Sequence, residues 1–100
     1  MISRLSVSKM KKLKVNNDLL GILNKINSES KTIEQWRENE SSDMYQTSNY
    51  CGGFDSIENE FTFSYYDEKS TEYWFQLSLD NIDKLISGQI TEIEMRLADK

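Results

Sequence analysis

The sequence predicts an α+β domain: an antiparallel sheet of three to five strands, with one or two N-terminal helices packed on one face and a short helix before the last strand. Three observations indicate this fold class. Two runs with an apolar residue at every second position are joined by a short polar segment, an amphipathic helical stretch precedes them, and a second helical stretch and a third alternating run follow. Alternation with period two indicates a half-buried strand, and spacing of three or four residues indicates a helix face.

Length and composition indicate the number of domains and the cellular location. One hundred residues, 37% of them hydrophobic, are enough for one domain, 1–100, with a core of its own. No apolar run reaches 18 residues, and the first residues lack the apolar region of a secretory signal. We therefore expect a cytoplasmic protein that does not associate with a membrane.

The N-terminal third predicts helices. Residues 2–7 alternate weakly and could form an edge strand, whereas the basic residues 9–14 read as a helix start or a loop. Residues 18–26 carry a helical apolar stripe, which consists of Leu19, Ile22, Leu23 and Ile26. Gly21 inside this helix suggests a close approach to a neighbour.

A second short helix is predicted from Thr32, which stands at capping-box spacing from Gln35, with Ile33 and Trp36 as its apolar contacts. The polar residues 37–48 read as a loop.

The glycine pair at 52 and 53 marks a turn or a close backbone approach. Phe54 and Ile57 begin another strand or pack under the hairpin that follows.

The hairpin comprises residues 61–66 and 73–79, joined by the polar residues 67–71. Side chains that face each other across two antiparallel strands share a face, so matching apolar sets fix the register. The predicted pairs are Tyr65 with Tyr73, Phe63 with Phe75, and Phe61 with Leu77.

After the hairpin, apolar spacing becomes helical, with Asp80 as the expected N-cap and Gly88 as the terminating residue. Residues 91–97 then form the last strand. Its inward side chains are Thr91, Ile93, Met95 and Leu97, and its outward ones are Glu92, Glu94 and Arg96.

The second face of the hairpin is the candidate partner-binding surface. Tyrosine and tryptophan are favoured as interface anchors, and an acidic rim speeds encounter with a basic partner. The candidate residues are Tyr66, Trp74, Glu72, Asp67, Glu68, Gln76, Glu92 and Glu94. The alternative is that an N-terminal helix covers this face and makes Trp74 part of the core.

Several chemistries are disfavoured by composition. The chain has no histidine, which removes histidine-based catalytic triads and histidine-ligated metal sites. Cys51 is the single cysteine, so an internal disulfide and a multi-cysteine metal site are excluded, and no activating partner for its thiol is evident. We therefore expect no enzyme, no cofactor and no metal.

Charge is distributed unevenly. Residues 1–15 hold five basic residues and no acid, whereas residues 16–100 hold seven basic and seventeen acidic residues, for a net charge of −5 overall. An acidic body is repelled by nucleic acid and attracted by basic partners. The expected function is that of a stoichiometric inhibitor, of the immunity or anti-defence type, that binds a basic and nucleic-acid-handling protein.

Residues 30–36 resemble the recognition helix of a helix-turn-helix repressor in their Thr-Ile-x-x-Trp spacing, which implies a DNA-binding regulator acting through residues 9–36. The chain departs from that motif, because Leu23 replaces a small residue and Asn27 and Ser28 replace the turn glycine and the apolar residue after it. Nucleic acid is therefore not the expected partner. Two further alternatives are a small-ligand-binding domain and a homodimer formed through sheet edges that carry no proline.

Overall fold

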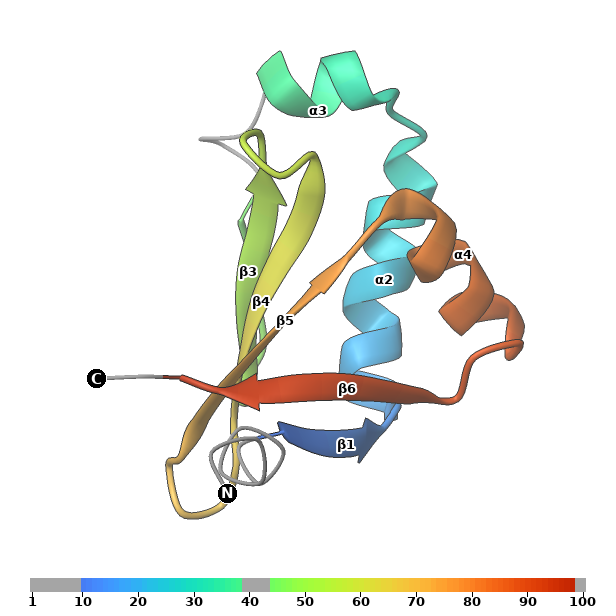
Figure 1. Cartoon of the computed structure of the whole chain (residues 1–100). Coiled ribbons are helices and arrows are strands. Elements are labelled where there is room, and N and C mark those ends of the chain that lie inside the picture. The colour runs from blue at the N-terminus through green and yellow to red at the C-terminus, as the bar shows by residue number, and fades with distance from the viewer. Residues whose placement is uncertain (1–9, 39–43, 99–100) are drawn as a thin grey trace, which may run out of the picture.

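The computed structural model describes residues 10–38 and 44–98, which form a six-stranded antiparallel sheet with helices on one side (Figure 1). In chain order the elements are β1 (Met10–Lys14), α2 (Asn17–Glu29), α3 (Ile33–Glu38), β2 (Met44–Gln46), β3 (Tyr50–Asp55), β4 (Glu60–Tyr66), β5 (Glu72–Leu77), α4 (Leu79–Ser87) and β6 (Glu92–Leu97). The strand order is β1-β6-β5-β4-β3-β2, and all neighbours are antiparallel. The α+β class is confirmed, while the sheet has more strands than the predicted three to five.

The extra strands come from segments that side-chain pattern did not identify. Residues 10–14, expected as a helix start or loop, form β1 because its backbone pairs with β6 and Leu13 faces Ile93 across the ladder. The polar segment 37–48, expected as a loop, contains β2, which pairs with β3. The edge strand predicted at residues 2–7 lies outside the described residues.

The central hairpin has the predicted register. Tyr65 pairs with Tyr73, Phe63 with Phe75 and Phe61 with Leu77. The rings of Phe63 and Phe75 stack with centroids 5.5 Å apart, and the rings of Tyr65 and Tyr73 are 6.4 Å apart. Burial of one apolar set and matching of its aromatic pairs therefore determine the register.

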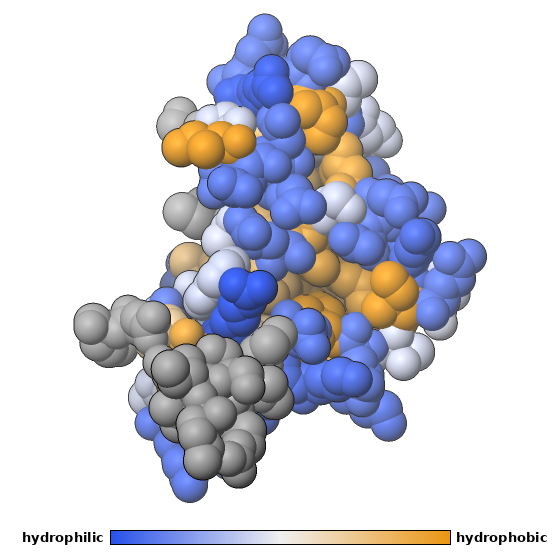
Figure 2. Space-filling model, in the orientation of Figure 1, coloured by the Kyte–Doolittle hydropathy of each residue, from blue (hydrophilic) through white to orange (hydrophobic). Residues whose placement is uncertain are grey.

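The core lies between the sheet and the helices. The predicted stripe of α2 is buried, and Asn16 caps this helix by accepting a hydrogen bond of 3.0 Å from the backbone N–H of Leu19. Figure 2 shows hydrophilic residues over most of the surface in view, with hydrophobic residues gathered toward the junction of the sheet and the helices. No helix of the described segments combines the length and the apolar character needed to cross a bilayer.

Helix α3 begins with the predicted capping box. The Thr32 N–H donates to Gln35 Oε1 at 2.8 Å, and the Gln35 N–H donates to Thr32 Oγ1 at 3.3 Å. Trp36 is 0% exposed, and its ring packs against those of Phe54 and Phe61. Ile33 also packs against the core, so this short helix is held on the sheet mainly by Trp36 with support from Ile33.

Gly52 and Gly21 lie in different surroundings, one tightly packed and one open. A Cβ on Gly52 would lie 2.2 Å from the carbonyl oxygen of Thr62, so the predicted close approach is confirmed, although the segment is strand β3 and not a turn. A Cβ on Gly21 would meet nothing within 4 Å, so the predicted close neighbour there is wrong.

The start of α4 and the position of Ile57 differ from the prediction. The N-cap of α4 is Ser78, two residues before the expected Asp80, because its hydroxyl accepts from the Asn81 N–H at 3.1 Å. Gly88 ends the helix with φ of 86°, as predicted. Ile57 lies in the turn after β3 and is 87% exposed, so it does not pack under the hairpin.

Candidate functional site

The sheet face opposite the helices, here called the open face, carries most of the predicted partner-binding residues. Helices α2, α3 and α4 all lie on the other side of the sheet (Figure 1). Trp74 on β5 and Tyr66 on β4 project on the open face, where Trp74 is half-buried by its neighbours and Tyr66 is 39% exposed. Within the described parts of the chain, no helix covers Trp74, so the alternative that it belongs to the core is not realised.

Side chains along β3, β4 and β5 hold one another in place on this face. Ser64 Oγ donates to Glu72 Oε2 at 3.0 Å, and Gln76 Nε2 donates to Thr62 Oγ1 at 3.3 Å. The Thr62 hydroxyl in turn donates to Asp55 Oδ2 at 3.5 Å. A partner would therefore meet polar groups whose rotamers are already restricted, which lowers the entropic cost of binding.

The two aromatic residues have charged neighbours. The Arg96 guanidinium lies 5.6 Å from the ring centroid of Trp74, within the range of a cation–π contact. The negative charge of Glu72 raises the pKa of the Tyr66 hydroxyl.

Charge on the open face is mixed. Glu92 and Glu94 lie on it as predicted, but Lys14 and Lys12 stand opposite them across the β1–β6 ladder. Acidic residues outnumber basic ones among the described strands of this face: Asp55, Glu60, Glu72, Glu92 and Glu94 against Lys12, Lys14 and Arg96. Sequence reasoning missed Asp55 because β3 was not predicted as a strand, and it missed Glu60 because the predicted strand began at Phe61, whereas β4 begins at Glu60.

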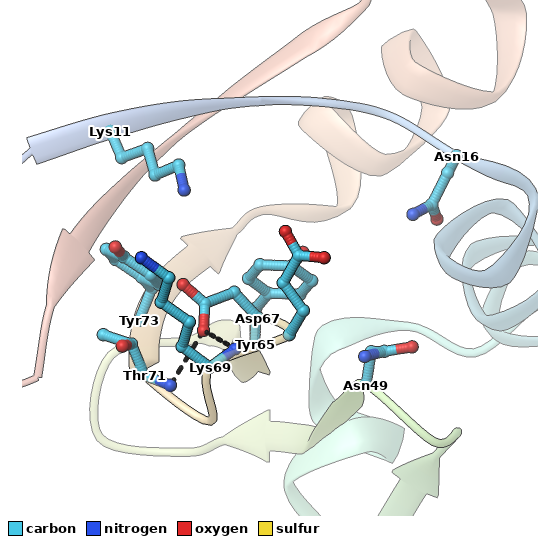
Figure 3. A pocket seen from close by; sticks show the side chains of 9 residues that line it. Lys11, Asn16, Asn49, Tyr65, Asp67, Lys69, Thr71 and Tyr73 are labelled. Carbon is cyan, nitrogen blue, oxygen red and sulfur yellow. Dashed lines mark hydrogen bonds between the residues drawn. The ribbon is translucent and has the colours of Figure 1, made fainter.

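Asp67 and Glu68 do not lie on the open face. They belong to the turn between β4 and β5 and line a hollow of about 760 Å³, here called the hairpin hollow (Figure 3). Its other lining residues are Lys11, Asn16, Asn49, Tyr65, Lys69, Thr71 and Tyr73. The two carboxylates there are balanced by Lys11 and Lys69.

Asp67 has a structural task in this turn. Its Oδ1 accepts hydrogen bonds of 2.9 Å from the backbone N–H groups of Lys69 and Thr71. These bonds, led by that from Thr71, lower the pKa of the Asp67 carboxyl. The carboxylate therefore shapes the hairpin and is turned away from the surface on which a partner was predicted.

The residues proposed for DNA binding do not form an exposed helix pair. The basic residues of β1 divide between the two sides of an edge strand, with Lys11 toward the helices and Lys12 and Lys14 on the open face. Trp36, the last residue of the helix-turn-helix resemblance, is buried in the core. Cys51 is half-buried on the open face of β3, opposite Ser64.

No group of three or more aspartate, glutamate or cysteine side chains in the described segments could hold a metal ion. The chain matches no protein-family model, and it has no significant match among curated proteins or solved structures.

Proposed function

We propose that this chain is a protein-binding domain that acts as a stoichiometric inhibitor of a basic, nucleic-acid-handling protein, and that the open face is its contact surface. Inhibition would follow from occlusion, because a bound acidic domain covers the basic surface that the partner otherwise uses for phosphates.

The observation that carries the proposal is the placement of Trp74 and Tyr66 on a sheet face that no described helix covers. Antiparallel sheets commonly have one solvated face, and such a face is usually polar. Here two large amphipathic aromatics stand among hydrogen-bonded polar side chains, a composition that protein interfaces favour.

Charge supports a basic partner. The net charge is −5, and acidic side chains outnumber basic ones on the open face. Such an imbalance raises the rate of encounter with a positively charged surface and discourages nucleic acid. The lysines of β1 make one edge of the face locally basic, so we expect the partner to contact mainly β3 to β6.

The proposal is tested by capture from the native lysate with three forms of the tagged chain: the wild type, the double variant Trp74→Ala with Tyr66→Ala, and the control Asn24→Ala. Asn24 is exposed on α2, away from the open face. We expect the wild type and the control to retain one basic protein at one-to-one stoichiometry and to inhibit its action on nucleic acid. The double variant should bind at least about thirtyfold more weakly, as the loss of an interface anchor does.

Circular dichroism of the double variant shows whether its fold is intact. Unchanged capture by the folded double variant contradicts the proposal, as does recovery of DNA or RNA in place of a protein.

The hairpin hollow favours a second candidate function, binding of a small polar ligand. Its volume of about 760 Å³ falls within the range of small-molecule sites, and its charges balance. Thermal stabilisation of the chain by members of a metabolite library, lost in Tyr73→Phe and Lys11→Gln, would support this function.

A further inference from the structure

The sheet opens between β5 and β6. These two strands pair only at Tyr73 with Leu97 and at Trp74 with Arg96, and they diverge beyond those pairs (Figure 1). Two hollows of about 280 and 210 Å³ lie along the opening, and both are lined by Gln76 and Glu94. We call this opening the β5–β6 wedge.

Backbone groups point into the wedge from both strands. In an antiparallel ladder, alternate residues direct their N–H and C=O toward the same neighbouring strand. The Ala98 N–H donates to the Glu72 carbonyl across the β5–β6 pair, so Trp74 and Gln76 also face β6. The Val15 N–H donates to the Thr91 carbonyl on the β1 side.

Because the carbonyl of Thr91 points toward β1, the main-chain N–H and C=O groups of Glu92 and Glu94 point toward β5. Beyond the two ladder pairs, Gln76 of β5 and Glu92 and Glu94 of β6 form no β5–β6 pair in the described part of the chain. Such unpaired edges are templates for an added strand.

The two sides of the wedge differ in chemistry. Toward the helices, its wall is mainly apolar, with Leu77, Leu85, Ile90 and Ile93 beside the polar Asn81. Toward the open face stand Glu60, Glu92 and Glu94, with Arg96 near the paired end. Side chains of an extended segment alternate between two faces, so a segment lying here would place every second residue against the apolar wall and the others beside the carboxylates.

We infer that the β5–β6 wedge receives an extended segment of the protein partner, in which apolar and basic residues alternate, by addition to the free edge of β5 or β6. This inference rests on the proposed function and specifies how the partner is recognised. Main-chain hydrogen bonds to Gln76 and Glu94 supply affinity, as in other cases of strand addition, and the alternating walls select the sequence. The partner would then contact the domain at two places on the open face: the side chain of Trp74 and the backbone of the wedge.

A peptide titration of the ¹⁵N-labelled full chain tests the inference without the natural partner. The probe is a short capped peptide of alternating lysine and valine. Three controls are the same composition in two blocks, a glutamate–valine alternation, and an N-methylated version that lacks alternate main-chain donors. We expect the alternating lysine peptide to shift the amides of Gln76, Glu92 and Glu94 and to slow their exchange with deuterium.

The block and N-methylated peptides should bind at least about tenfold more weakly, and the acidic peptide should not bind. The variant Glu60→Gln with Glu94→Gln should weaken binding of the lysine peptide, whereas Glu68→Gln in the hairpin turn should not. Absence of protection at Gln76 and Glu94, or equal binding of the block peptide, overturns the inference.

The same amide exchange, measured in the complex with the captured partner, separates this inference from the proposed function. If the partner binds through Trp74 and the amides of Gln76 and Glu94 still exchange freely, the strand-addition inference is wrong and the proposed function stands. Protection of these amides on partner binding, lost on replacing alternate residues of the partner's segment with proline, supports the inference.

Discussion

Substitution of Gly52 in β3 and of Gly21 in α2 by alanine should have opposite effects on stability. At Gly52 the added methyl group would lie 2.2 Å from the Thr62 carbonyl oxygen, 2.5 Å from Phe63 Cδ1 and 2.8 Å from Phe63 Cα. Two of these three atoms belong to the backbone of β4, so rotation of a side chain does not remove the clash. Strands β3 and β4 must separate, and the core beneath them must open.

The magnitude follows from the same geometry. Overpacking of a core costs about 1–3 kcal/mol and more where the backbone must move, so we expect Gly52→Ala to lower the free energy of unfolding by about 3 kcal/mol or more. Gly21 lies inside α2 with nothing within 4 Å of an added Cβ. There the gain in helix propensity should stabilise the protein by about 0.5–1 kcal/mol.

Urea unfolding, followed by far-ultraviolet circular dichroism and by tryptophan fluorescence, to which the buried Trp36 contributes, measures both changes. Gly21→Ala is the matched control, because the chemical change is identical. A Gly52→Ala protein within about 1 kcal/mol of the wild type would refute the β3–β4 packing described above.

Three further predictions concern single side chains. Tyr50 is 1% exposed, and burial raises the pKa of its hydroxyl from 10.0 to about 12. The stability that this group contributes is therefore complete below pH 10 and should be lost as the pH rises toward 12, by at most about 2.7 kcal/mol. Unfolding curves recorded across that range should show the loss in the wild type and not in Tyr50→Phe. Because the pKa of Asp67 is lowered in the folded protein, its contribution to stability is complete above the ordinary aspartate pKa and is lost as the pH falls through the folded value. The amide resonances of the β4–β5 turn should report this acid transition in the wild type, and Asp67→Ala should abolish it. An unchanged acid transition in the variant would contradict the prediction. Asn16→Ala removes the N-cap of α2 and should cost about 1 kcal/mol in thermal unfolding, whereas an exposed Asn24→Ala should cost little.

Local pattern predicted the parts of the fold in which side chains alone decide the outcome. The hairpin register follows from matching Phe63 with Phe75, and the start of α3 follows from the spacing of Thr32 and Gln35. In each case the interacting residues are close in sequence or lie in two neighbouring strands with the same alternation of apolar residues. Their interactions therefore determine the local structure without contacts to distant parts of the chain.

Strands β1 and β3 could not be predicted in this way. The lysines of β1 suggest a solvated segment, and its extended conformation is fixed by backbone bonds to β6, about eighty residues away. The glycines of β3 have no side chain that shows alternation, although Gly52 is required by its contact with Thr62. Long-range pairing and close backbone approach leave weak signals in a single sequence.

The candidate site was predicted in part. Placement of Tyr66 and Trp74 on one face follows from strand alternation, but exposure of that face depends on all three helices packing on the other side. Asp67 was expected beside them and instead lies in the hairpin hollow, because its carboxylate accepts two backbone N–H groups of the turn. The wedge between β5 and β6 could not be predicted from the sequence, because apolar and polar residues alternate along both strands in the paired and the unpaired parts alike.

The most direct test of the partner-binding face uses the two tryptophans of the chain as opposed reporters. Trp74 lies on the open face, whereas Trp36 of α3 is buried between that helix and the opposite face of the sheet. A titration of the ¹⁵N-labelled chain with its captured partner, followed through the two indole N–H resonances, should shift or broaden the signal of Trp74 and leave that of Trp36 in place. A perturbed Trp36 signal beside an unchanged Trp74 signal would contradict the account and place the partner on the helical side.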